Sequence, residues 1–168
     1  MRYSINHQGN VMVPAMPFTN MSEEDVSAII SFLRVQSPIK NKVPKTKYTF
    51  LGKALTHFLL RPYNQSNEIP KSVKRGNTVA YGEYLMNSVA NCKGCHTTFN
   101  IMKMDYEGVP LSGGTETVEK INKYKTPNLT PDPETGHMVN WTEEQFIARF
   151  KLGKTLPDSP MPWDAFLK

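Results

Sequence analysis

Two cysteines and a histidine stand together in the segment Cys92-Lys93-Gly94-Cys95-His96, and these are the only two cysteines in the chain. A pair of thiols three positions apart, followed directly by a histidine, is the pattern of covalent haem attachment. The two sulfur atoms add across the vinyl groups on one edge of the porphyrin, and a histidine nitrogen binds the iron. The segment therefore predicts one covalent haem c on Cys92 and Cys95, with His96 as an axial ligand.

Other uses of the same residues are less consistent with the sequence. A dithiol redox site of the thioredoxin type favours a turn between a strand and a helix, and no strand-like segment precedes Cys92. A structural zinc site needs four ligands, whereas the remaining histidines, His7, His57 and His137, have no paired spacing. A disulfide between the two cysteines closes a very short loop and leaves His96 without a role. Haem attachment is the favoured interpretation.

The second axial ligand has to come from another part of the chain. Methionine is more often a core residue than a ligand, but Met161 is well placed, because the chain between His96 and Met161 is long enough to pass round the porphyrin. Pro160 and Pro162 stiffen its loop, and a thioether ligand raises the reduction potential. Met102 and Met104 are too close to His96, and Met86 falls within a predicted helix. Met138 and His137 remain alternatives.

Three segments carry the caps and apolar spacing of helices. The first begins at Ser22 and ends at Arg34, with Asp25 expected to complete a capping box. The second covers 77–90 and leads into Cys92; the third begins at Thr142, paired with Gln145, and ends at Gly153. The positions expected to be buried in the second helix are Val79, Tyr84, Leu85 and Val89. No segment alternates like a strand, and thirteen prolines indicate long irregular connections. The predicted fold class is all-α with long loops.

An internal repeat predicts how the chain is organised. Residues 13–18 and 158–163 both place a methionine before a proline and an aromatic residue. We expect 1–36 to be the C-terminal remnant of a preceding domain, 37–76 a linker, and 77–168 a domain lacking its terminal helix. The sequence is then a fragment of a longer tandem protein, in which Met16 is the counterpart of Met161.

The net charge of +5 comes largely from lysines in 40–53 and from 71–75. A solvated basic linker is the ordinary interpretation; the alternative is steering toward an acidic redox partner or an anionic membrane surface. No stretch approaches the roughly 20 apolar residues of a membrane helix, and no secretory signal is recognisable at the start of the sequence. Basic and aromatic residues are not interleaved, so we expect no nucleic-acid partner.

Taken together, these segments resemble the c-type cytochrome family, and more narrowly the tandem multi-haem cytochrome c subunits that partner membrane-bound alcohol and gluconate dehydrogenases. The matching segments are Tyr81–Leu85, Cys92–Thr97, Gly113-Gly114, Pro127–Asp132, Thr135-Gly136, Trp141 and Pro160–Trp163. The resemblance implies cytochrome c-like helices with long loops, wrapped around one covalent haem. It covers nearly the whole chain and is weakest in the linker.

The resemblance also implies roles for individual residues. Pro110 matches the loop whose backbone carbonyl accepts a hydrogen bond from the ligand histidine, a contact that orients the ring. Tyr124, Asn128, Thr130 and Trp141 are expected beside the haem propionates, with bracing of their own loops as the alternative. In this fold a terminal helix packs near Gly82, and the helix Ser22–Arg34 is expected to take that place.

The expected function is single-electron transfer in a respiratory or dehydrogenase-linked chain. An iron with both axial positions filled by His96 and Met161 cannot readily bind a substrate, and no catalytic acid–base pair stands out. The expected partners are a dehydrogenase, a quinone-linked complex or a terminal oxidase. The location is the periplasm or the outer face of the cytoplasmic membrane, where haem is attached to such motifs. The alternative is a haem enzyme or gas sensor with an open sixth coordination site.

Overall fold

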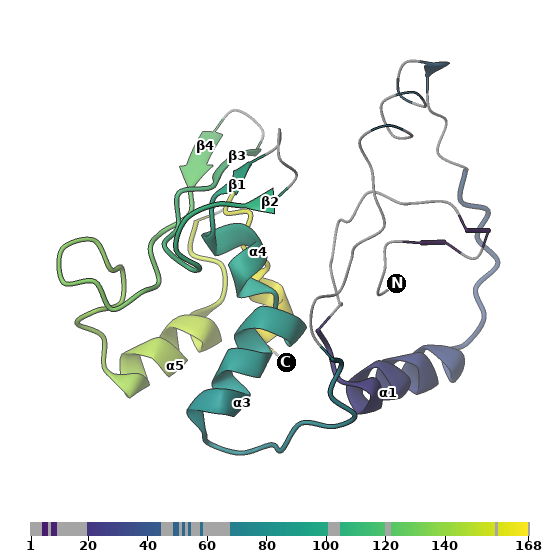
Figure 1. Cartoon of the computed structure of the whole chain (residues 1–168), viewed down its shortest axis with the longest axis horizontal. Coiled ribbons are helices and arrows are strands. Elements are labelled where there is room, and N and C mark those ends of the chain that lie inside the picture. Colours follow the sequence, from purple (N-terminus) through teal and green to yellow (C-terminus); the bar gives the residue numbers. More distant parts are fainter. Residues whose placement is uncertain are drawn as a thin grey trace. The chain divides into compact units, whose positions relative to one another are not determined.

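The structure, a computed structural model, describes residues 5–6, 8–9, 20–44, 49–50, 52, 54, 58, 68–100, 105–119, 122–156 and 158–167. The chain divides into two compact units, Met1–Asn91 and Cys92–Lys168 (Figure 1). The division falls directly before the first cysteine, so the CxxCH segment and Met161 belong to the second unit. The predicted division into a remnant, a linker and a domain stays a prediction.

In the first unit, helix α1 (Glu23–Arg34) begins where the sequence predicts. Ser22 is the N-cap and its hydroxyl accepts a hydrogen bond from the Asp25 N–H at 3.1 Å. The N–H groups of Glu23 and Glu24 donate to the carbonyls of Pro70 and Lys71 at 3.1 and 3.0 Å. Since the first N–H groups of a helix have no partner within it, these contacts tie the start of α1 to the 70–71 segment.

Helix α3 (Val79–Tyr84) continues directly into the π-helix η1 (Leu85–Val89), so the predicted helix over 77–90 is confirmed. Its last part is wound more loosely, with the Ala90 N–H donating to the Leu85 carbonyl at 2.8 Å. The expected burial is wrong for three of its side chains: Val79 is 91% exposed, and Leu85 and Val89 are also exposed. Tyr84 alone among the four is partly buried.

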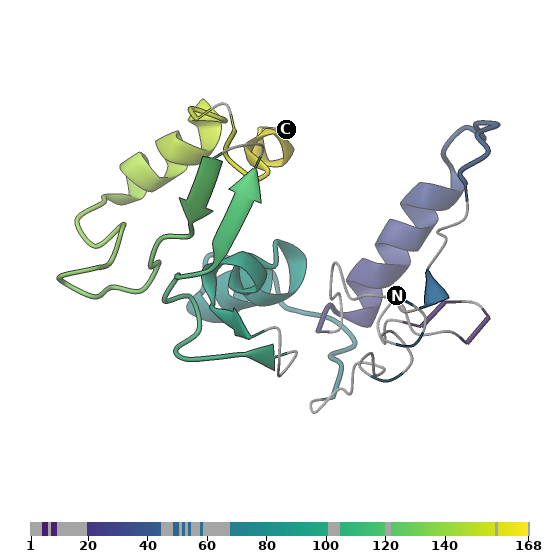
Figure 2. The same ribbon diagram turned by 90° about the horizontal axis from the view of Figure 1, so that it is seen from above.

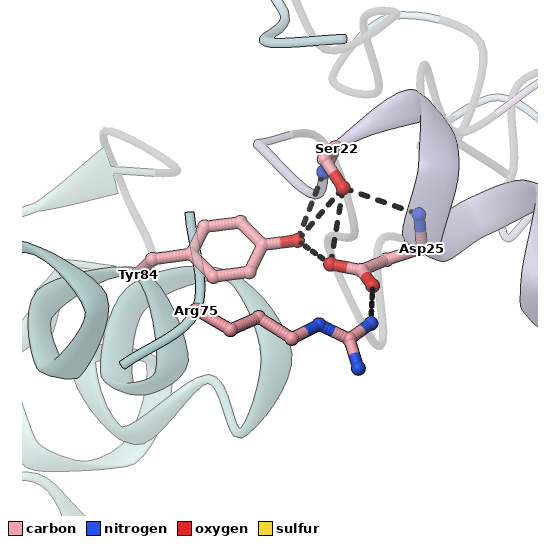
Figure 3. A network of polar contacts seen from close by, with 4 residues as sticks. All are labelled: Ser22, Asp25, Arg75 and Tyr84. Carbon is pink, nitrogen blue, oxygen red and sulfur yellow. Dashed lines mark hydrogen bonds and ion pairs between the residues drawn. The ribbon is translucent and has the colours of Figure 1, made fainter. Parts of the chain in front are cut away.

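Helices α1 and α3 are joined by a polar network (Figure 3). The Tyr84 hydroxyl donates to Asp25 Oδ2 at 2.5 Å and accepts from the Ser22 N–H at 3.0 Å. Arg75 Nη2 lies 3.0 Å from Asp25 Oδ1. The predicted capping box is therefore only half formed, because Tyr84 occupies the Ser22 N–H that Asp25 was expected to bind.

The expected packing of α1 near Gly82 is also wrong. A Cβ placed on Gly82 would meet no described atom within 4 Å, so no other described helix approaches it closely. Ile29 and Ile30, on the apolar face of α1, are 41% and 38% exposed. The first turn of α1, rather than its apolar face, makes the contact with α3, and it does so through Tyr84.

The second unit contains helix α4 (Cys92–His96) and helix α5 (Glu143–Leu152), a 3-10 turn η2 (Trp163–Phe166) and four short strands. Strand β1 (Phe99–Asn100) pairs with β2 (Asp105–Tyr106), and β3 (Glu116–Glu119) with β4 (Asn122–Lys125), both antiparallel (Figure 2). The prediction of helices with long loops is confirmed, and the four short strands are an addition that the all-α prediction did not include. Strands of two to four residues, rich in charged side chains, are too short to show a period-2 pattern.

Helix α5 packs against η2 through aromatic rings. The Phe150 ring lies 4.9 Å from Phe146, 5.6 Å from Trp163 and 5.2 Å from Phe166, measured between centroids. The capping box of Thr142 and Gln145 is confirmed, with both of its hydrogen bonds formed. Gly153 ends the helix at φ 71°, as predicted. Within the described part of the chain, no helix is long and apolar enough to cross a membrane.

Candidate functional site

The His96 side chain is buried and held in one orientation. Its Nδ1 lies 3.0 Å from the carbonyl oxygen of Pro127. A carbonyl can only accept, so this contact assigns a ring proton to Nδ1; in the neutral imidazole the lone pair is then on Nε2. The His96 carbonyl accepts a further hydrogen bond from the Gly113 N–H at 2.8 Å. The arrangement is that of a metal-binding histidine with its second nitrogen fixed by a carbonyl.

The carbonyl that holds His96 belongs to Pro127, and the prediction that Pro110 has this role is wrong. The loop containing Pro110 turns at Leu111, which has φ 67°. Leu111 donates its N–H to the Thr97 hydroxyl at 3.0 Å and accepts from the Leu129 N–H at 2.8 Å. This loop therefore braces the residue after the histidine and the segment after Pro127, and the one Nδ1 proton goes to Pro127.

Gly113 lies against the segment that carries this carbonyl. A Cβ on Gly113 would lie 2.5 Å from the Thr126 oxygen, 2.6 Å from the Pro127 carbonyl carbon and 2.7 Å from the Asn128 nitrogen. Its φ of +76° is also one that favours glycine. Gly113-Gly114 is among the segments that carry the resemblance, without a predicted role, and the structure shows that only a residue without a side chain fits at Gly113.

Threonine side chains with no role predicted from the sequence complete the surroundings of His96. Thr97 is 1% exposed, and its carbonyl accepts from the Thr115 hydroxyl at 2.6 Å. The Thr115 N–H donates to the Thr126 hydroxyl at 3.1 Å, and the Thr98 hydroxyl donates to the Gly113 carbonyl at 3.1 Å. Of these, Thr97 alone lies in a segment that carries the resemblance; the others are threonines in loops, with no distinguishing pattern.

The thiols of Cys92 and Cys95 are both free. Cys92 is partly buried, and burial raises the pKa of its thiol above the ordinary value. Cys95 is exposed. Two unpaired thiols on one short helix, next to a histidine with a free Nε2, are the donor set that covalent haem c requires. The residues present therefore fit this cofactor.

Met161 lies partly buried in a loop that is fixed at both ends. Its carbonyl accepts from the Trp163 N–H at 2.8 Å, and Trp163 Nε1 donates to the Ser159 hydroxyl at 3.3 Å. The Arg149 guanidinium stacks on the Trp163 ring at 3.5 Å and donates to the Gly153 carbonyl at 2.7 Å. These contacts hold the loop on α5, while ligation by Met161 stays a prediction.

Two of the residues predicted beside the propionates, Asn128 and Thr130, brace their own loop. Asn128 Oδ1 accepts from the Thr130 N–H at 2.9 Å and from the Thr130 hydroxyl at 2.7 Å. Asn128 Nδ2 donates to the Thr135 hydroxyl at 2.9 Å. Tyr124 is partly buried in β4, and the Trp141 ring lies 5.5 Å from the alternative ligand His137. Contacts with a propionate stay a prediction for all four.

Several residues weighed in the sequence lie outside the described part of the chain. They are His7, residues 13–18 with Met16, His57, Met102 and Met104.

The chain is similar to subunits of dehydrogenases over more than nine tenths of its length. It is 24% identical over 92% of its residues to the fructose dehydrogenase cytochrome subunit of Gluconobacter japonicus. It is 26% identical over 92% to the cytochrome c subunit of alcohol dehydrogenase (quinone) from Gluconobacter oxydans. A subunit of nicotinate dehydrogenase from Pseudomonas putida is 27% identical over 91% of the chain.

The chain spans about a third of the first two proteins, 32% and 34% of their lengths, and 13% of the third. No family model matches it. The resemblance to cytochrome c subunits of dehydrogenases that the motifs predicted is thereby confirmed.

Proposed function

We propose that this chain transfers single electrons through one haem c, attached to Cys92 and Cys95 and ligated by His96 and Met161. The observation that carries the proposal is the 3.0 Å contact between His96 Nδ1 and the Pro127 carbonyl, within a CxxCH helix. When bound, the haem supplies an iron that alternates between two oxidation states. With both axial positions filled from the protein, electron exchange at the haem edge is the chemistry left to the site.

The surrounding residues keep the two ligands in place. The Pro127 carbonyl holds the Nδ1 proton of His96 and so makes the imidazole a better donor at Nε2. The Arg149 guanidinium, stacked on Trp163 and bonded to Gly153, stiffens the loop of Met161. Ligands that move little between oxidation states favour fast electron transfer, because little reorganisation accompanies each electron.

The names of the similar proteins support a place beside a dehydrogenase. Two are cytochrome subunits, of fructose dehydrogenase and of alcohol dehydrogenase (quinone), and the third is a subunit of nicotinate dehydrogenase. We infer that this chain accepts electrons from a dehydrogenase subunit and passes them toward a quinone-linked complex or a terminal oxidase. Since haem attachment to CxxCH takes place outside the cytoplasm, its location is the periplasm or the outer face of the cytoplasmic membrane.

The proposal is tested by producing the full chain behind an export signal in a bacterium with haem-attachment machinery. We expect haem staining that survives a denaturing gel, a far-red methionine–iron absorption band, and no carbon monoxide binding by the reduced protein. Cys95→Ala should lose full covalent attachment. Met161→Ala should lose the far-red band and bind carbon monoxide, whereas Met138→Ala, a matched control at the rival methionine, should keep the band.

Two results would overturn the proposal. Wild-type protein without covalent haem removes its basis altogether. Wild-type protein that has haem but readily binds carbon monoxide when reduced has an open sixth site, and the haem enzyme or gas sensor then replaces the electron carrier.

A further inference from the structure

The hydroxyl oxygen of Thr117 is buried and has no hydrogen-bond partner among the described residues. Thr117 lies in β3, in register with Tyr124 of β4, and both residues are partly buried. A buried polar group left unpaired costs about 1–3 kcal/mol, and nearly all buried polar groups in folded proteins are paired. The Thr117 hydroxyl is therefore a buried donor without a partner in the described part of the chain.

The face of the hairpin that carries Thr117 is the face directed at the His96 segment. Side chains two apart on a strand share a face, so Thr117 lies on the side of Thr115, whose hydroxyl donates to the Thr97 carbonyl at 2.6 Å. The opposite side is exposed to solvent, and its described members are Glu116, Val118, Lys123 and Lys125. The hairpin thus has an inner face toward the haem-binding segment and an outer face toward water.

The two ends of the hairpin reach the two segments that carry the proposed iron ligands. At one end, two residues beyond β4, the Pro127 carbonyl holds His96. At the other end, Asn122 Nδ2 donates to Asp158 Oδ2 at 3.2 Å, in the loop that leads to Met161. In the register of the hairpin, the pair formed by Thr117 and Tyr124 lies between these two anchors.

We infer that the Thr117 hydroxyl donates a hydrogen bond to a propionate carboxylate of the haem. The propionates are the only strong hydrogen-bond acceptors on the porphyrin periphery, and a hydroxyl bonded to a carboxylate is among the stronger hydrogen bonds in proteins. The inference rests on the proposed function, since it requires the haem. It gives the hairpin a role in binding the cofactor, in addition to supporting His96.

The test compares haem-loaded Thr117→Val, which removes the hydroxyl at nearly constant shape, with Thr117→Ser, which keeps it. Val118→Ala on the outer face is the positional control. The reduction potential of each protein is measured as a function of pH. Because a donated hydrogen bond favours the ionised carboxylate, Thr117→Val should move the propionate transition upward by about one pH unit. Thr117→Ser and Val118→Ala should keep the wild-type transition.

The free energy of unfolding of Thr117→Val gives a second measurement. Its change has one sign if the hydroxyl binds the propionate and the opposite sign if the hydroxyl is unpaired. If the hydroxyl binds the propionate, Thr117→Val loses that hydrogen bond and unfolds at lower denaturant concentration than wild type. A hydroxyl that is simply unpaired is better replaced by a methyl group, so the variant unfolds at higher concentration and its pH transition stays in place; this result overturns the inference. If Thr117→Val does not accumulate, Thr117→Ala removes the hydroxyl without adding bulk and answers the same question.

Failure of this inference is distinguishable from failure of the proposed function. If wild type has covalent haem and a methionine–iron band, and Thr117→Val has the same dependence of reduction potential on pH as wild type, only the role of Thr117 is refuted. A wild-type protein without covalent haem removes both.

Discussion

Replacing Gly113 by alanine tests whether the orientation of His96 depends on the close approach of two loops. The added Cβ would lie 2.5–2.7 Å from three backbone atoms of Thr126, Pro127 and Asn128. Backbone atoms cannot rotate away as the end of a side chain can, so the whole 126–128 segment has to move. That movement carries the Pro127 carbonyl away from His96 Nδ1.

The expected loss of stability can be built from three contributions. A residue other than glycine at φ +76° costs about 1–2 kcal/mol. Crowding against a packed segment costs about 1–3 kcal/mol, and weakening of the hydrogen bond from His96 to Pro127 costs about 1 kcal/mol. Together they predict that Gly113→Ala lowers the free energy of unfolding by about 3 kcal/mol or more.

The assay is guanidinium unfolding of the haem-loaded protein, followed at the haem absorption so that the second unit is observed. Gly108→Ala is the matched control, because Gly108 has a similar φ of +80° but open space around the Cβ position. Gly108→Ala should lower the free energy of unfolding only by the cost of a residue other than glycine at positive φ, about 1–2 kcal/mol. Gly113→Ala should also raise the reduction potential, since an imidazole with a weaker Nδ1 hydrogen bond donates less to the iron.

Equal unfolding free energies for Gly113→Ala and Gly108→Ala would refute this reasoning, because the crowding and the lost hydrogen bond would then contribute nothing. An unchanged reduction potential in a destabilised Gly113→Ala would show that the strain stays in the loop and does not reach His96.

Three further predictions concern the network at α1 and the loop of Met161. Tyr84→Phe should destabilise the first unit by about 1–2 kcal/mol, because the two hydrogen bonds of the Tyr84 hydroxyl, to Asp25 and from the Ser22 N–H, are lost. Urea unfolding followed by circular dichroism measures this loss. The Tyr84 hydrogen bond holds the pKa of Asp25 below the ordinary 3.8. The stability that this ionised carboxylate adds to the folded state is therefore present above about pH 3.8 and is lost as pH falls through the lowered pKa. Unfolding free energies across this acid range should fall less steeply in Tyr84→Phe than in wild type, and equal slopes would exclude the linkage. Arg149→Ala should weaken the far-red band of the methionine–iron bond, because the loop of Met161 loses the stacking on Trp163 and the hydrogen bond to Gly153. Arg149→Lys keeps the charge but not the planar stack, so its far-red band should be nearly as weak as that of Arg149→Ala. A band of wild-type strength in Arg149→Lys would contradict the role of stacking.

Features that depend on short chain distances follow from the sequence alone. Cys92, Cys95 and His96 lie within five residues, so their spacing is enough to predict how they meet a porphyrin edge. The caps at Ser22, Thr142 and Gly153 were predicted for the same reason: the hydrogen bonds of a helix end involve residues only a few positions away. The motifs spread through the chain also indicated the resemblance to dehydrogenase cytochromes.

Packing across the fold selects which distant residues serve the site. Pro110 lies in a loop that contacts Thr97, but the carbonyl at His96 Nδ1 is that of Pro127, in the segment that packs against Gly113. The β3–β4 hairpin was missed because its strands are short and polar, so no apolar alternation marks them.

Tyr84 shows the same limit within a predicted helix. The local pattern predicted a capping box in which Asp25 binds the Ser22 N–H, but a hydroxyl from 62 positions away takes that donor. Local patterns predict that a backbone group needs a partner. Which partner it finds depends on the folding of the whole unit, because a distant side chain that the fold brings close can accept from the same donor.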